Sequence, residues 1–153
     1  MTLTSAFAQL QVQVPPVPPP CALNNTMTPV LGVSLQRYLE SNSMYEVEYT
    51  DDIQAALEDA GFRVYPDNTY QLSDLASISL EGRVDSWVSA LGDSGKRIGA
   101  VTLQVRDLGS DAILLTLKQP SPILAFRAPY PKDFAKQVAQ AMLSRFCQLP
   151  RGK

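Results

Sequence analysis

The sequence predicts one α+β domain with a mostly antiparallel sheet and two helices packed on one face of it. Two observations carry this prediction. Apolar and polar residues alternate from Ala76 to Leu117, which is typical of strands with one buried and one wet face. On either side of this run, apolar residues recur at helical spacing. With 153 residues the chain has room for one domain, which we expect over residues 30–150.

The run from Ala76 to Leu117 is expected to form three consecutive antiparallel strands. Two short segments of turn-forming residues, Gly92–Gly95 and Gly109–Asp111, divide the run and indicate hairpin connections. The buried face is expected to hold the apolar members of each strand, which are Ile78, Leu80, Gly82, Val84 and Val88, then Val101, Leu103 and Val105, then Ile113, Leu115 and Leu117.

The part of the chain before this meander predicts a β-α-β unit. Val30–Leu35 is expected to be its first strand and Phe62–Tyr65 its second. Between them, Thr50 is a candidate N-cap of a helix, and Gly61 suits the left-handed position after that helix. Tyr45–Tyr49 fits both a short strand and a backward continuation of the helical stripe, and periodicity alone does not decide between them.

A second helix is expected to close the chain. Pro120 and Pro122 end the preceding strand because proline cannot donate to a ladder. Pro131 suits the first turn of the helix, and Pro150 is expected to end it. Its predicted apolar face comprises Phe134, Val138, Ala141, Met142, Phe146 and Leu149.

Composition argues against several classes of function. The formal net charge of -2, with Lys and Arg scattered along the chain, lacks the basic footprint of a nucleic-acid-binding protein. The sequence contains no histidine, which is the commonest general base near neutral pH and the commonest transition-metal ligand. We therefore expect no catalytic residue, no metal site and no cofactor. No apolar run reaches the length of about 18 residues that a membrane span needs.

Residues 1–29 predict a signal-peptide remnant followed by a Pro-rich tether. Ala6–Ala8 matches the A-x-A cleavage pattern of a secretory signal peptide, although the charged and long apolar regions that precede such a site are missing. A chance match is equally open. Gln9–Pro20 passes from alternating Gln and Val into a proline run, which predicts an extended, semi-rigid spacer. A ligand for a proline-reading groove is the alternative.

The two cysteines, Cys21 and Cys147, lie near the two ends of the predicted domain. In an exported chain this arrangement favours a disulfide between the start of the domain and its last helix. Two unrelated thiols, typical of a cytosolic protein, are the alternative. Pro18–Pro20 stand before Cys21 where a lipobox would carry small or aliphatic residues, so the lipidation signal of a bacterial lipoprotein is absent.

Three short motifs resemble catalytic or ligand-binding signatures, and local structure explains each of them better. Gly92–Gly95 reads Gly-Asp-Ser-Gly, as around a serine-protease nucleophile, but that chemistry needs a histidine base. The following Lys96 resembles part of a phosphate-binding loop, but Arg97 stands where Ser or Thr is required. Asp51 and Asp52 could be catalytic or metal-binding carboxylates, but a role at the start of the predicted helix, where they complement the helix dipole, explains both without any further function.

One surface is a candidate interface. Trp87, the single tryptophan, falls on the polar side of its strand with Arg83 and Asp85, and aromatic anchors dominate many interfaces. The alternative is that the strand bends or bulges after Asp85 and turns Trp87 inward, or that the closing helix covers it. The Pro-rich exit from the third strand completes the candidate surface with Pro122, Ile123, Leu124 and Phe126.

The order of the segments resembles that of small envelope domains of Gram-negative bacteria. The likeness covers most of residues 30–149 and lies in Ile53–Val64, Leu80–Val84, Val101–Leu108 and Ile113–Leu117, followed by the closing amphipathic helix. The families concerned are the auxiliary lipoproteins of ABC-type transport systems, the lipopolysaccharide-assembly lipoprotein and the outer-membrane activators of penicillin-binding proteins. The resemblance implies a non-enzymatic accessory domain that docks onto a larger envelope machine.

The sequence therefore predicts a non-enzymatic extracytoplasmic domain that mediates protein–protein docking in a bacterial cell-envelope assembly, secretion or transport complex. We expect it in the periplasm or otherwise outside the cytoplasm, with outer-membrane association left open. The expected partners are envelope proteins, with a second copy of the chain as a further option, and no nucleic acid. A lipid- or glycan-binding domain with a cleft between helices and sheet is the alternative, and an enzyme comes third.

Overall fold

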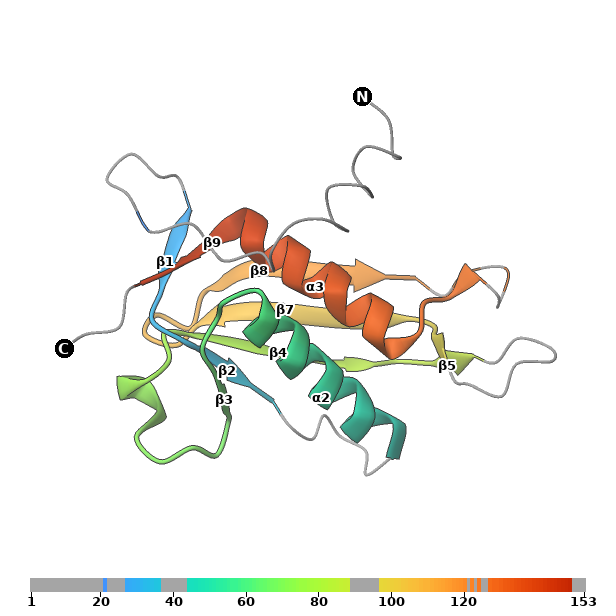
Figure 1. Cartoon of the computed structure of the whole chain (residues 1–153), viewed down its shortest axis with the longest axis horizontal. Coiled ribbons are helices and arrows are strands. Elements are labelled where there is room, and N and C mark those ends of the chain that lie inside the picture. Colours follow the sequence, from blue (N-terminus) through green and yellow to red (C-terminus); the bar gives the residue numbers. More distant parts are fainter. Residues whose placement is uncertain are drawn as a thin grey trace.

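The fold is known from a computed structural model, which describes residues 21, 27–36, 44–88, 97–120, 122, 124 and 127–149, with the backbone alone for residues 44–49. The elements follow one another along the chain as in Figure 1. They are β1 (Thr28–Val30), β2 (Val33–Leu35), α2 (Met44–Asp59), β3 (Val64–Pro66), the 3₁₀ turn η1 (Leu72–Asp74), β4 (Ile78–Val84), β5 (Trp87–Val88), β6 (Arg97–Ile98), β7 (Val101–Asp107), β8 (Ile113–Gln119), α3 (Pro131–Arg145) and β9 (Phe146–Gln148).

The main sheet has five strands in the order β3-β2-β4-β7-β8. The meander is confirmed, because β4 pairs antiparallel with β7, and β7 pairs antiparallel with β8. The sheet as a whole is mixed, since β2 runs parallel to both β3 and β4. Two small strand pairs extend it at its two ends: β1 pairs parallel with β9, and β5 pairs antiparallel with β6. The predicted α+β class is therefore confirmed.

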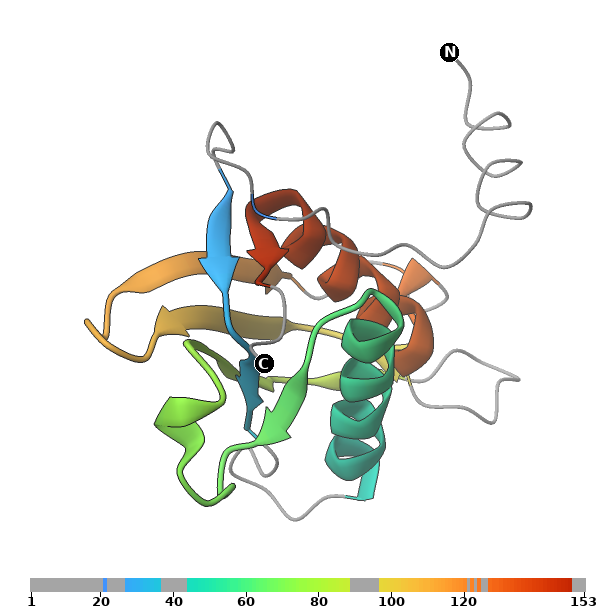
Figure 2. The same ribbon diagram turned by 60° about the vertical axis from the view of Figure 1, so that its left-hand side comes forward.

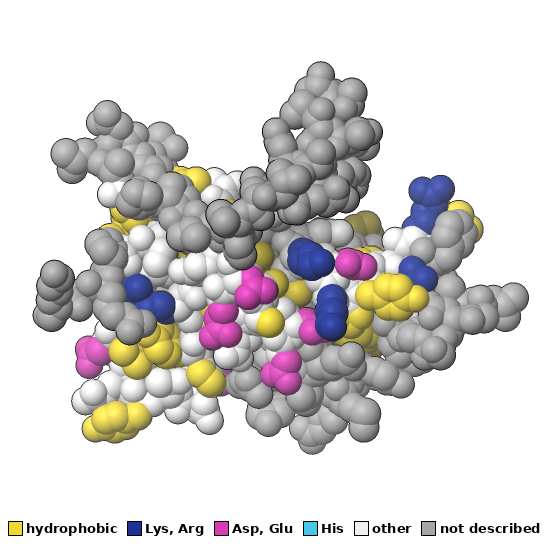
Figure 3. All heavy atoms as spheres, in the orientation of Figure 1, with side chains coloured by type: hydrophobic (Ala, Val, Ile, Leu, Met, Phe, Trp, Pro, Cys, Tyr) yellow, Lys and Arg dark blue, Asp and Glu magenta, His cyan; other side chains and the backbone are white. Residues whose placement is uncertain are grey.

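Helices α2 and α3 lie side by side on one face of the sheet, in both views of the ribbon (Figures 1 and 2). The core forms between these helices and the strands, and each large side chain buried there contributes roughly 1.5 to 3 kcal/mol. On the outer surface of the helices, acidic and basic side chains are interspersed rather than separated by sign (Figure 3). The largest fully buried side chains include Phe146, Ile53, Leu57, Ile78, Leu80, Ile98 and Met142.

The predicted first strand, Val30–Leu35, is divided between two sheets. β1 pairs with β9 and β2 joins the main sheet, so the single-strand prediction was wrong at its centre. The break falls at Gly32, where a Cβ atom would collide with the carbonyl oxygen of Leu75 and lie 2.9 Å from the Tyr65 ring. Glycine is needed here because another part of the backbone approaches this closely.

A polar clamp holds the chain at this break. Arg63 Nε and Nη2 donate to the carbonyl oxygen of Leu31 at 3.2 and 2.9 Å. Gln148 Nε2 donates to the same oxygen at 2.8 Å and to that of Val30 at 2.8 Å. Arg63 Nη2 also donates to the carbonyl oxygen of Leu149 at 2.8 Å, so one guanidinium joins both ends of the described domain. We call Arg63, Gln148 and the carbonyls they bind the terminal clamp.

Helix α2 differs from the prediction at its start and agrees with it at its end. It begins at Met44, so Thr50 is not an N-cap but a buried side chain within the helix, 2% exposed. The ambiguous stretch before Thr50 is therefore helical, and Asp51 and Asp52 lie beyond the first turn. At the other end, Gly61 has φ 97° and its N–H donates to the carbonyl oxygen of Glu58 at 2.9 Å, which is the predicted glycine stop.

Helix α3 begins at Pro131 as predicted and ends earlier than predicted. It stops at Arg145, and Phe146 already belongs to strand β9 rather than to the helix face. The predicted end at Pro150 was therefore wrong, because the residues after Arg145 form strand β9 and pair with β1 instead of continuing the helix. Phe146 still fills the core, at 1% exposed.

The predicted disulfide is present. Cys21 is bonded to Cys147 in β9, with the two Cα atoms 5.4 Å apart and a sequence separation of 126. Cys147 is fully buried. The bond fastens the residue that follows the Pro-rich segment to the strand beside β1.

We expect the disulfide to be a large part of the stability of the domain. Its loop is long, so by the chain-entropy account reduction should lower the free energy of unfolding by about 4 to 5 kcal/mol. Urea unfolding with and without dithiothreitol measures this, and the double variant Cys21→Ala, Cys147→Ala serves as a control that the reductant should not affect. Equal unfolding midpoints for oxidised and reduced wild type would contradict the expectation.

Candidate functional site

The outer edge of strand β8 is the longest sheet edge that the structure describes without a neighbouring strand. β8 has seven residues, carries no proline and ends only before Pro120. The opposite edge, β3, has three residues and finishes at Pro66, a combination that blunts an edge against further pairing. An edge such as that of β8 presents backbone N–H and C=O groups to any extended segment that can reach it.

The two faces of β8 differ in polarity along this edge. Leu115 and Leu117 pack against the core from the helix side. Thr116 and Lys118 are exposed on the other side. The predicted alternation is correct from Leu115 to Lys118. It was wrong at the start of the strand, where Ile113 is 45% exposed and Leu114 packs against the core, because a register shift between β7 and β8 lies there.

A hollow lies beside the edge, between β8 and the first half of α3. Its volume is about 450 Å³. Leu117, Phe134 and Val138 form its floor, with Phe134 and Val138 almost fully buried. The exposed side chains of Thr116, Lys118 and Gln137 stand around it. At the other end of the strand the guanidinium of Arg145 donates to the carbonyl oxygen of Leu114 at 3.0 Å, which covers that end of the edge. We call the hollow and the neighbouring edge from Thr116 to Gln119 the β8 groove.

The turn between β7 and β8 is fixed by one carboxylate. Asp107 accepts hydrogen bonds from the backbone N–H of Ser110 at 2.7 Å and from its hydroxyl at 2.9 Å. These bonds, the backbone bond first, hold the pKa of Asp107 below its usual value. Asp111 completes the turn in the left-handed region, with φ 67°. The predicted turn is thereby confirmed, and it sets the register of β8.

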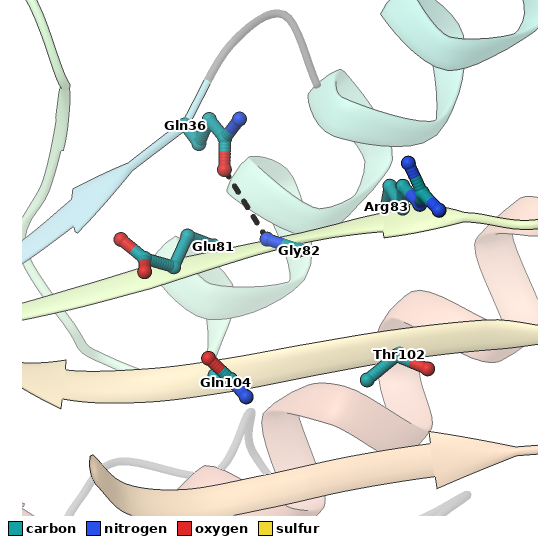
Figure 4. Close-up of a pocket in the computed structure, with 6 residues that line it drawn as sticks. All are labelled: Gln36, Glu81, Gly82, Arg83, Thr102 and Gln104. Carbon is teal, nitrogen blue, oxygen red and sulfur yellow. Dashed lines mark hydrogen bonds between the residues drawn. The ribbon is translucent and has the colours of Figure 1, made fainter. Parts of the chain in front are cut away.

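A second hollow, of about 300 Å³, lies on the sheet face opposite the helices. It opens where β2 ends beside β4, and polar side chains surround it (Figure 4). The amide oxygen of Gln36 accepts a hydrogen bond from the N–H of Gly82 at 3.2 Å. This bond stands where a ladder bond would form if β2 continued beside β4. The six residues drawn around it are Gln36, Glu81, Gly82, Arg83, Thr102 and Gln104.

Most charges in this second hollow are already paired within the protein. Glu81 accepts from Arg106 Nε at 3.0 Å, and this bond is the main reason why the pKa of Arg106 is raised above its usual value. Arg83 Nε lies 3.1 Å from a carboxylate oxygen of Asp85. Gly82 has φ 145°, and a Cβ atom there would collide with the carbonyl oxygen of Thr102. The hollow is therefore largely a consequence of strand geometry.

The structure describes five of the seven residues that the sequence grouped as an interface. Arg83 and Asp85 are exposed and form their ion pair on the open face of the sheet. Trp87 lies in β5 and is partly buried against the core, so it does not project freely beside them. Pro122 is half-buried and Leu124 is 46% exposed. Ile123, Phe126 and the Gly92–Gly95 motif lie outside the described residues.

The segment before α3 is fastened to β6 by contacts that the sequence did not indicate. Arg97 donates to the carbonyl oxygen of Ala128 and to the hydroxyl of Tyr130, both at 3.0 Å. Its guanidinium also lies 4.2 Å from the centre of the Tyr130 ring. These contacts fix where α3 begins and hence where its first half meets β8.

Sequence reasoning did not find the β8 groove. A signal for the strand was present in the alternation from Ile113 to Leu117, but its position at the edge follows from pairing order, which no local pattern encodes. Among the residues that the structure describes, no group of His, Cys, Asp and Glu could hold a metal ion. Neither of the described helices combines the length and apolar character of a membrane span.

Comparison with known proteins found similarity to solved structures alone. No family model matches the chain, and no curated protein matches it. One structural neighbour is a dodecamer of a PelC point variant from Paraburkholderia phytofirmans, with 15% identity, a TM-score of 0.47, and coverage of 78% of this chain and 88% of that chain. Another is a PelC dodecamer from the same organism, with 17% identity, a TM-score of 0.46, and coverage of 78% and 86%. Similarity at this level does not indicate what the present chain does.

We expect the Asp107 turn to weaken on acidification. A carboxylate whose pKa is lowered by folding stabilises the fold above its unfolded pKa, and the contribution is lost as the pH falls through the folded value. Ser110→Ala removes one of the two Ser110 bonds, so the pKa of Asp107 should rise towards its usual value. A carbon-13 NMR titration measures this, with Ser144→Ala as an exposed control on α3. An unchanged Asp107 titration in Ser110→Ala would refute the assignment.

Proposed function

We propose that the chain is a non-enzymatic extracytoplasmic accessory domain that docks an extended segment of protein at the β8 groove. The observation that carries the proposal is the edge of β8, which has no neighbouring strand among the described residues, beside a hollow floored by Leu117, Phe134 and Val138. Backbone groups on such an edge supply affinity by strand addition, and a flanking pocket supplies specificity for alternate side chains. The segment expected there has apolar side chains at every second position, because one side of the edge is apolar and the other is polar.

Two further features support the compartment and the class. A disulfide that ties the start of the domain to β9 is typical of proteins outside the cytoplasm. The sequence offers no histidine for acid–base chemistry, and its protease-like motif lacks the base that the reaction needs. Both features fit an envelope accessory role of the kind that the family resemblance implied.

Glycan binding on the open face of the sheet is the second candidate. The hollow around Gly82 presents amide, hydroxyl and charged groups of the kind that bind sugar hydroxyls. However, Gln36, Glu81 and Arg83 are already engaged within the protein, so a ligand would have to displace those bonds. Because an engaged group gains little by exchanging partners, we favour the β8 groove.

Site-specific photo-crosslinking in cells that export the protein tests the docking function. A photoreactive residue at Thr116 or Lys118, both exposed on β8, should form protein adducts in the full-length chain. The same residue at Tyr70, which is 84% exposed and lies beyond the β3 edge, is the matched control and should form few or none. Adducts that are absent from β8, or equally frequent at Tyr70, would count against the proposal.

A further inference from the structure

We infer that thiol–disulfide exchange acts on this domain at Cys21, with Cys147 as the leaving thiol, and that exchange detaches Cys21 from β9 while the domain stays folded. The co-reactant is a dithiol of the class that thiol–disulfide oxidoreductases carry. Two features lead to this assignment: the unequal burial of the two cysteines, and the hydrogen bonds that hold β9 without them. Neither feature involves the β8 groove.

The two halves of the disulfide differ in exposure. Cys147 is 0% exposed, so its sulfur has no surface that another thiol could reach. Cys21 is half-buried and keeps part of its surface open to solvent. Because a thiolate must reach the sulfur that it attacks, access decides which of the two sulfurs reacts. Cys21 is therefore the position open to attack.

The exchange consists of two displacements. One thiolate of the dithiol attacks Cys21 Sγ, so a bond between these two sulfurs forms, the bond between Cys21 and Cys147 breaks, and Cys147 leaves as a thiolate that takes up a proton. The second thiolate of the dithiol then attacks the first within the mixed disulfide, and Cys21 leaves in turn. Two electrons pass from the dithiol to the protein, and the dithiol becomes a disulfide.

Strand β9 is held by bonds that use neither sulfur. The N–H of Leu149 donates to the carbonyl oxygen of Val30 at 2.8 Å. Gln148 Nε2 donates to the same oxygen at 2.8 Å, and Arg63 Nη2 donates to the carbonyl oxygen of Leu149 at 2.8 Å. The terminal clamp therefore keeps Cys147 in place when the disulfide is broken.

In the folded domain the disulfide closes only a short loop, because β1 and β9 are already paired. Pro29 lies opposite Cys147 in that pairing, eight positions along the chain from Cys21. The sequence separation of 126 matters for the unfolded chain, in which no strand pairing shortens the loop. Exchange moves the attachment of Cys21 from β9 to the start of β1 at Thr28, and the seven steps between them span at most about 25 Å at roughly 3.5 Å per residue. The redox state thus sets how far the chain before Cys21 can reach from the domain.

Limited exchange of the oxidised full-length chain with glutathione tests the point of attack. The reaction is quenched with acid, free thiols are alkylated in denaturant, and both cysteines are mapped by mass spectrometry. Glutathione should be found on Cys21 and the alkyl group on Cys147, in at least tenfold excess over the reverse pattern. In concentrated urea the preference should almost vanish, because burial no longer distinguishes the two sulfurs. Equal attack on both cysteines in the native chain, or a preference that survives in urea, would overturn the inference.

The reduced chain without denaturant distinguishes release from unfolding. The Leu149 amide should stay protected from hydrogen exchange, and iodoacetamide should alkylate Cys147 at least tenfold more slowly than Cys21. Gln148→Ala removes a bond of the terminal clamp and should speed the alkylation of Cys147, whereas Gln140→Ala, at an exposed position on α3, is the control and should not. Loss of Leu149 protection on reduction would show that the disulfide itself holds β9, and would refute the inference.

Discussion

The terminal clamp is the interaction on which the arrangement of this domain depends. The chain leaves the main sheet at Leu31 and Gly32, and the carbonyl oxygen of Leu31 accepts from both Arg63 and Gln148. Half-buried carbonyls outside a ladder need such donors, since a buried acceptor without a partner costs about 1 to 3 kcal/mol. By satisfying them, the clamp allows β1 to turn aside and pair with β9. The two ends of the described domain therefore meet on one side of it, where the disulfide also lies.

This placement links the stability of the domain to its surface. Because β9 sits directly after α3, Cys147 holds Cys21 at the end of the helix that overhangs β8. The contacts of Arg97 with Tyr130 position the other end of the same helix. Helix α3 is thus fixed at both ends, with its first half forming one wall of the β8 groove. The α3 wall of the groove is therefore formed before anything binds, and preformed sites order fewer groups on binding.

Much of the fold could be predicted from the sequence, and the parts that could not share a physical cause. The meander, the glycine stop at Gly61 and the disulfide follow from local periodicity, turn chemistry and the presence of two cysteines. The predicted start of α2 and the predicted end of α3 were both wrong. Thr50 lies inside a helix and Phe146 lies in a strand because tertiary contacts outweigh the local capping and helix-breaking signals. The site was missed for the same reason. Which strand lies at an edge is decided by pairing order, which residues near the edge do not encode.

The central claim is that the outer edge of β8 becomes paired in the working protein. Residue-resolved amide hydrogen exchange of the oxidised full-length chain, alone and in complex with the protein that β8 crosslinking captures, measures this most directly. The account predicts that β8 amides pointing away from β7 exchange at least tenfold more slowly in the complex, while amides of β3 at the other edge do not change. Equal exchange of the β8 amides in both samples would contradict it, and slow exchange in the chain alone would mean that the edge is already covered within one copy.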